Sequence, residues 1–220
     1  VMIGGGNSLG ALMHGVITDY KGDDFPEGQG VLVTKGLGFF PFGIVDQHFD
    51  KRGRIGRLIM TLLNNKNQFN LGFGVDENTA LIYDSKQKRL KVAGAAGVTI
   101  INSEKAKYHK NDSLSTILNL MVSRLENGDS FDLTAGTVIP AEGKRSIMGN
   151  EYYNIENPGQ AGILSGYSSE FRDLLTVNLM DNKGASIVHN LIFYNQQHGL
   201  QVTLSKTSGS KGFYTDEPDG

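Results

Sequence analysis

The sequence contains no cysteine, which excludes disulfide bonds, thiolate metal sites and a cysteine nucleophile. No apolar run approaches the ~20 residues that a membrane-spanning helix needs, so we expect no membrane partner. A large excess of basic side chains is also missing: 21 lysines and arginines stand against 23 acidic residues, for a formal net charge of −2. This balance argues against nucleic acid as a partner. The 220 residues suffice for one domain with a sizeable core.

The opening of the chain is rich in glycine. An apolar run at residues 1–3 is followed by GGGNSLGA at residues 4–11 and then by further apolar residues. This order predicts a strand, a tight turn and a helix, and G-x-S-x-G at such a turn is a nucleophile elbow with Ser8 at its apex. Glycine on either side of Ser8 leaves room for the adjoining strand and helix. A glycine loop without chemistry is the alternative, whereas a phosphate-binding loop would need G-K-[ST].

A second strand is predicted to end in polar side chains. It covers residues 43–45 and ends in Asp46, Gln47 and His48, and a basic helix follows at residues 54–63. Histidine titrates near neutrality and can take the proton of a serine hydroxyl, which by itself is a weak nucleophile. His48 is therefore the candidate general base.

A third strand, at residues 71–75, ends in Asp76 and Glu77. Serine, histidine and an acid at three strand ends, in that chain order, are typical of a catalytic triad in which the acid holds the imidazole in one tautomer. Adjacent residues of a strand point in opposite directions, so only one of these two acids can face His48.

Three segments of the chain resemble the S51 serine peptidases, the family of cyanophycinase and aspartyl dipeptidase. The segments are GNSLGA at residues 6–11, DQHFDKRGRIGRL at residues 46–58 and GFGVDENTAL at residues 72–81. The resemblance covers roughly the first hundred residues, and its middle segment is the most specific.

The resemblance implies a role for each triad residue. Ser8 would be the nucleophile, His48 the general base and Glu77, rather than Asp76, the acid. The family usually has T-S-A-G-A at the elbow, whereas this chain has Leu9 after the serine. The Leu9 amide would be the oxyanion donor, and its larger side chain bears on rate and substrate range.

The resemblance also implies a pocket lined by polar side chains, namely Asp46, Gln47, Arg54, Arg57 and Asn78. Arg54 and Arg57 stand at helical i, i+3 spacing and share a face, from which each can grip a carboxylate bidentately. The free α-carboxylates of cyanophycin would suit these arginines, and Asp46 would suit the arginine of the substrate. A solvated basic face that includes Arg52 is the alternative.

The implied function is serine-dependent hydrolysis of β-aspartyl-arginine units in cyanophycin to β-Asp-Arg dipeptides through an acyl-enzyme. Cleavage of other β-aspartyl peptides or of aspartyl dipeptides is one alternative, and a non-catalytic binder of aspartate-rich peptides is another. No cofactor is expected. No metal site is expected either, because His189 and His198 have no cysteine or acid at ligand spacing.

We expect an α/β fold with a mostly parallel central sheet flanked by helices, similar to the class I glutaminase-like fold, over residues 1–204. Residues 205–220 are polar and predict a flexible tail. The other expected elements are strands at 79–83, 89–93, 97–102 and 131–139, a helix or long strand at 116–125, a helix at 171–180, and a hairpin of 187–194 with 200–204.

The elbow strand stands first in the chain, although such a strand belongs in the middle of a sheet. We therefore expect an amino-terminal segment of the same protein to supply its neighbours. A homodimer is also expected. The predicted location is cytoplasmic, with secretion as the alternative, because the lack of cysteine fits both environments.

Overall fold

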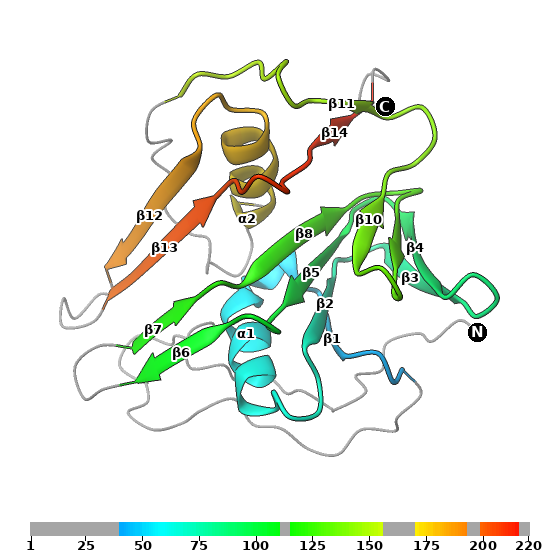
Figure 1. Ribbon diagram of the computed structural model, residues 1–220, viewed down its shortest axis with the longest axis horizontal. Coiled ribbons are helices and arrows are strands. Elements are labelled where there is room, and N and C mark those ends of the chain that lie inside the picture. Colours follow the sequence, from blue (N-terminus) through cyan, green and yellow to red (C-terminus); the bar gives the residue numbers. More distant parts are fainter. Residues whose placement is uncertain (1–39, 111–114, 156–169, 193–198, 216–220) are drawn as a thin grey trace.

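The computed structural model describes residues 40–110, 115–155, 170–192 and 199–215, and these form mostly β-structure with few helices (Figure 1). Ser8 and Leu9, and with them the predicted elbow, lie outside the described residues. No helix in the described ranges is long and apolar enough to span a membrane. The helical segments are η2 (Asp50–Arg52), α1 (Ile55–Asn64), α2 (Glu170–Asp173) and the π-helix η3 (Leu174–Met180).

A four-stranded mixed sheet holds the segments that end in the predicted site residues. Its order is β1 (Ile44–Gln47), β2 (Leu71–Val75), β5 (Val98–Asn102) and β8 (Met121–Leu125). β1 and β2 are parallel, and the other two pairs are antiparallel. The parallel pair is joined through helix α1, as a crossover requires, whereas hairpins return the chain between β2 and β5 and between β5 and β8. In the described part of the sheet, the predicted mostly parallel arrangement is therefore limited to β1 and β2.

A second sheet is antiparallel throughout its described strands. Its order is β10 (Thr137–Ile139), β9 (Ser130–Asp132), β4 (Arg89–Gly94) and β3 (Thr79–Asp84). Three two-stranded antiparallel pairs complete the described strands: β6 (Lys107–Lys110) with β7 (Ser115–Leu118), β12 (Ser186–Ile192) with β13 (Gly199–Ser205), and β11 (Arg145–Ser146) with β14 (Phe213–Tyr214). In the described part of the polar segment, residues 205–215, Ser205 ends the paired strand β13, and Phe213–Tyr214 form the paired strand β14.

Most of the predicted elements are confirmed, and two need correction. Residues 116–125 form two strands, because Asn119 takes a φ of 61° and breaks the run between β7 and β8. Residues 131–139 form a hairpin of two short strands, β9 and β10, instead of the one strand that was predicted. Asp132 Oδ1 accepts the backbone N–H groups of Thr134 and Ala135, and Gly136 turns the chain with a φ of 66°.

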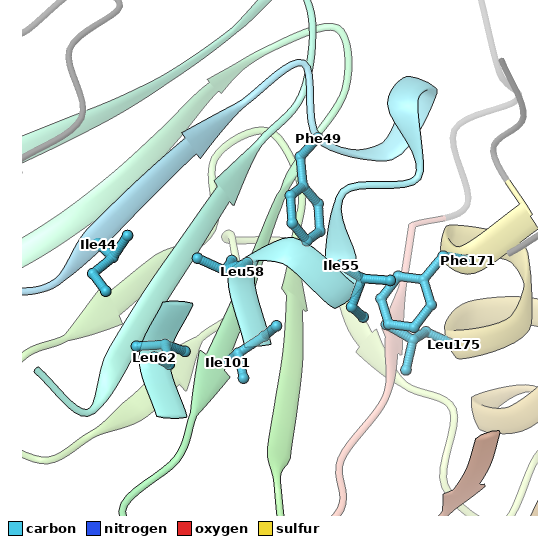
Figure 2. Close-up of a cluster of buried hydrophobic side chains, with 8 residues drawn as sticks. All are labelled: Ile44, Phe49, Ile55, Leu58, Leu62, Ile101, Phe171 and Leu175. Atoms are coloured by element: carbon cyan, nitrogen blue, oxygen red, sulfur yellow. The ribbon is translucent and has the colours of Figure 1, made fainter. Parts of the chain in front are cut away.

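Two glycines of β2 allow the chain to pack closely on one face of the mixed sheet. A Cβ at Gly72 would lie 2.8 Å from a Leu62 methyl and 2.9 Å from a Leu58 methyl of α1, and a Cβ at Gly74 would overlap the Phe49 ring. Helix α1 packs against this face, and Phe171 and Leu175 extend the same apolar cluster toward η3 (Figure 2).

The opposite face of the mixed sheet packs on the second sheet. Phe73 of β2, which points away from its glycine neighbours, meets Leu90 and Val92 of β4, and all three side chains are 0% exposed. The same alternation sends Ile101 toward α1 and Ile100 toward the second sheet. The mixed sheet is therefore the middle layer, and both faces of β2 are buried.

Candidate active site

His48 follows directly after β1, at a sharp turn of the chain. Its φ of 49° is uncommon for a residue with a side chain, and such a conformation persists only where the surroundings enforce it. Phe49 supplies that constraint. Its ring is 1% exposed against Gly74, and its backbone N–H donates to the carbonyl of Val75 over 3.2 Å. With Phe49 buried, the neighbouring His48 side chain points outward and is 45% exposed.

Glu77 meets His48 across the ends of the two parallel strands. His48 Nδ1 lies 2.9 Å from Glu77 Oε1, and Lys51 Nζ lies 3.4 Å from Glu77 Oε2. The hydrogen bond from His48, and secondarily Lys51, hold the pKa of the Glu77 carboxyl below its usual range. An ionised carboxylate can only accept, so Nδ1 donates and Nε2 of a neutral ring is left with a lone pair. The pair thus presents Nε2 as a base.

Asp76, the other acid at this strand end, does not contact His48. It is 8% exposed and forms an ion pair with Arg124 of β8, with 2.6 Å between Oδ2 and Nη2. Asn78 follows Glu77 with a φ of 54° and turns the chain into β3, with its side chain exposed. The structure therefore places Glu77, and not Asp76, against the imidazole.

Asp46, near the end of β1, is fully buried and is contacted by Arg57 of α1 and by Arg54, the residue that precedes α1. Its Oδ2 accepts Arg57 Nε over 2.8 Å, and its Oδ1 accepts Arg57 Nη2. Arg54 Nη1 lies 3.6 Å from Asp46 Oδ1 and donates to the backbone carbonyl of Gln47. The predicted shared face of Arg54 and Arg57 is thus present, and it meets a carboxylate of this chain.

The burial of these groups separates the predicted pocket residues into two sets. Arg57 is 3% exposed, so a solvated basic face is excluded for it. Gln47, which directly precedes His48, and Asn78, which directly follows Glu77, are both exposed. Among the described residues, no group of three histidines or acids could hold a metal ion.

Comparison with known proteins agrees with the resemblance of the sequence segments. No protein-family model matches the chain. Proteins named cyanophycinase match it from Trichormus variabilis (34% identity over 143 residues, 62% of this chain and 47% of the relative), Geminocystis herdmanii (32% over 135 residues, 58% and 48%) and Thermosynechococcus vestitus (34% over 137 residues, 59% and 41%). The chain is similar to cyanophycinases. It spans about half the length of the curated cyanophycinases it matches.

Proposed function

We propose that this protein is a serine peptidase of the cyanophycinase kind, in family S51, that releases β-Asp-Arg dipeptides from cyanophycin. The observation that carries the proposal is the 2.9 Å contact between His48 Nδ1 and Glu77 Oε1, formed where parallel strands β1 and β2 end side by side. A histidine held at Nδ1 by an ionised acid is the base half of a triad. The similarity to cyanophycinases names the substrate class.

The proposed chemistry uses this base on Ser8. Nε2 of His48 takes the hydroxyl proton while the serine oxygen attacks the substrate carbonyl, and the Leu9 amide stabilises the oxyanion. The imidazolium then gives its proton to the leaving amine, and an acyl-enzyme remains on Ser8. Water activated by the same histidine releases the product. Glu77 stabilises the imidazolium in both halves, and its lowered pKa keeps it ionised for this purpose.

We assign the proposed substrate contacts by how exposed each predicted pocket residue is. Gln47 and Asn78 are exposed beside the base and are proposed to bind the substrate directly. Arg54 is partly exposed and is proposed to bind a substrate carboxylate next to its contact with the Gln47 carbonyl. Asp46 and Arg57 have each other as partners and are proposed to shape the pocket by fixing the end of β1 beneath it.

Three structural expectations belong to the same proposal. They are a nucleophile elbow at Ser8, a class I glutaminase-like sheet completed by an amino-terminal segment of the same protein, and a homodimer. The β1–α1–β2 unit, with its parallel strands and connecting helix, is the described part that fits such a sheet.

The proposal is tested by incubating the protein with cyanophycin and, separately, with the dipeptide Asp-Leu. We expect β-Asp-Arg in the first reaction by mass spectrometry and no free leucine in the second. Ser8→Ala and His48→Ala should each lower kcat by several orders of magnitude, and the double variant should lose little more, because triad members act as a unit. Wild-type turnover by Ser8→Ala would refute the mechanism, and leucine release alone would point to a dipeptidase.

A further inference from the structure

A buried carboxylate next to the His48–Glu77 pair connects three segments of the chain. Asp76 Oδ1 accepts the backbone N–H of Asp50 over 3.1 Å, and Oδ2 accepts the backbone N–H of Gly97 over 3.2 Å. The backbone N–H of Asp76 in turn donates to the Gly97 carbonyl over 3.1 Å. One side chain thus joins η2, which follows β1, to the end of β2 and to the turn before β5.

The hydrogen bond between the Asp50 amide and the Asp76 carboxylate links the backbone next to His48 with the backbone next to Glu77. Asp50 lies two residues after His48, and Asp76 directly precedes Glu77. The bond between the Asp50 amide and the Asp76 carboxylate therefore closes the gap between the two backbone segments whose side chains meet at 2.9 Å. The backbone hydrogen bond from Phe49 N–H to the Val75 carbonyl is a second link between the same two segments. Together these bonds limit how far the two segments can separate.

Arg124 balances the charge of Asp76 inside the protein. The side chains of Arg124 and Asp76 are 5% and 6% exposed, and Arg124 Nη1 also donates to Thr99 Oγ1 over 3.3 Å. Nη2 lies 2.6 Å from Asp76 Oδ2 and has no hydrogen bond of good geometry to any described residue, so this contact acts chiefly through charge. A buried carboxylate needs such a counter-charge.

Gly97 provides the room for this arrangement. A Cβ at this position would lie 2.7 Å from Arg124 Nη2 and 2.9 Å from its central carbon, and it would overlap the Leu125 carbonyl. Glycine at position 97 therefore lets the guanidinium reach Asp76 while its own amide donates to the same carboxylate.

We propose that Asp76, with Arg124 as its buried counter-ion, is a positioning residue that holds His48 and Glu77 at hydrogen-bond distance. The proposal rests on the proposed function, in which that pair is the base of the reaction. Asp76 is buried and has no contact with His48. It acts by fixing the backbone on both sides of the pair, where a shift of about 1 Å can cost on the order of 100-fold in rate.

The test compares Asp76→Asn with a matched variant, Asp129→Asn. Asp129 is 5% exposed, accepts two backbone N–H groups over 2.8 Å and pairs with Lys144 over 2.8 Å, but it lies in the turn between β8 and β9. Asp76→Asn should lower kcat on cyanophycin about 10–100-fold with KM changed less than about threefold, whereas Asp129→Asn should leave kcat within about twofold. In a Glu77→Gln background, Asp76→Asn should lower kcat by less than about threefold, because Asp76 acts by positioning Glu77.

A spectroscopic readout keeps this test independent of peptidase activity. Nitrogen-15 NMR of the imidazole reports which ring nitrogen of His48 carries the proton. We expect an Nδ1–H ring in the wild type and in Asp129→Asn, and a mixture of tautomers in Asp76→Asn that resembles Glu77→Gln. If the wild type does not cleave cyanophycin, the proposed function fails and this spectrum still decides the role of Asp76.

Unaltered NMR signals with kcat within twofold of wild type in Asp76→Asn would overturn the proposal. Fully independent losses in the double variant with Glu77→Gln would also overturn it. Should Asp76→Asn fail to fold, Asp76→Asn combined with Arg124→Gln removes both buried charges. This combination should still show the mixed tautomers, and a wild-type spectrum from it would show that Asp76 serves only charge balance.

Discussion

His48 Nδ1 lies 2.9 Å from Glu77 Oε1 although 29 positions separate the two residues in the sequence. The parallel pairing of β1 and β2 brings them together, since it sets Gln47 opposite Val75 and ends both strands at the same edge of the sheet. Residues that follow two neighbouring parallel strands are placed side by side, which is why such edges carry active sites. The following predictions test what this edge does and what holds it in place.

Replacing Glu77 by Gln should keep the fold and lower kcat strongly. The amide carries no charge to stabilise an imidazolium and no longer selects the Nδ1–H tautomer, so we expect a loss on the order of 10³–10⁴-fold. The measurement is steady-state kinetics on cyanophycin, with thermal melting to verify folding. Glu142→Gln, at an exposed position, is the control and should behave as wild type. Activity within tenfold of wild type in Glu77→Gln would remove Glu77 from the triad.

Replacing Arg57 by Lys should act mainly on stability. Lysine keeps the charge but cannot replace the two guanidinium nitrogens that each donate to a different Asp46 oxygen. Both partners are buried, so the free energy of unfolding should fall by about 1–3 kcal/mol. Urea denaturation measures this loss, and kinetics at low temperature separate it from any change in KM. An unchanged stability with KM raised about tenfold or more would instead assign Arg57 to the substrate.

A methyl group at Gly74 should displace the Phe49 ring and, through it, shift the neighbouring residue His48. The new Cβ overlaps the Phe49 ring, so Gly74→Ala must push out the side chain that anchors the turn at His48. We expect a loss of about 1–3 kcal/mol in stability and a lower kcat. Gly184→Ala is the matched control, because its Cβ would meet nothing nearer than 3.9 Å. Equal effects of the two substitutions would show that Phe49 does not position His48.

The stability of the protein should depend on pH through Asp50. Burial raises the pKa of the Asp50 carboxyl from 3.8 to about 6, the Asp76 carboxylate adds to the rise, and Arg124 and Arg172 oppose it. Between these two values the folded protein binds a proton that the unfolded chain has lost. The contribution of Asp50 to stability is therefore complete below about pH 4 and declines as pH rises through about 6.

Asp50→Asn should remove this decline because its side chain does not titrate. Melting temperatures at pH 4.5 and pH 7.5 would measure the effect as the difference between wild type and variant at each pH. Relative to wild type, the melting temperature of Asp50→Asn should be higher at pH 7.5 than at pH 4.5. The carboxyl of Glu77 has a lowered pKa and works in the opposite direction, since its contribution is lost as pH falls, but it is common to both proteins. A gap between the two proteins that is the same at both pH values would contradict the assignment to Asp50.

Local elements could be predicted wherever their own residues decide them. The hairpin of β3 and β4 is an example, because Asp84 accepts the N–H groups of Lys86 and Gln87 within the turn itself. The breaks at Asn119 and within residues 131–139 were missed, since an apolar pattern does not show where a single residue adopts a positive φ. The predicted mostly parallel arrangement is limited to β1 and β2 for a different reason, because the direction of the other described strands depends on which distant strand meets β5.

The sequence by itself determined the polar ends of β1 and β2 and, because strand geometry alternates side chains along the chain, that only one of Asp76 and Glu77 can face His48. The resemblance to the S51 peptidases favoured Glu77, and the tertiary structure places Glu77 there. Only the tertiary structure decided that Asp46 and Arg57 have each other as partners and that Arg124 reaches Asp76 from β8. Those contacts depend on packing between segments far apart in the chain. A buried charge pairs with an opposite charge that the fold brings close to it, and the spacing of residues in the sequence does not show which one that is.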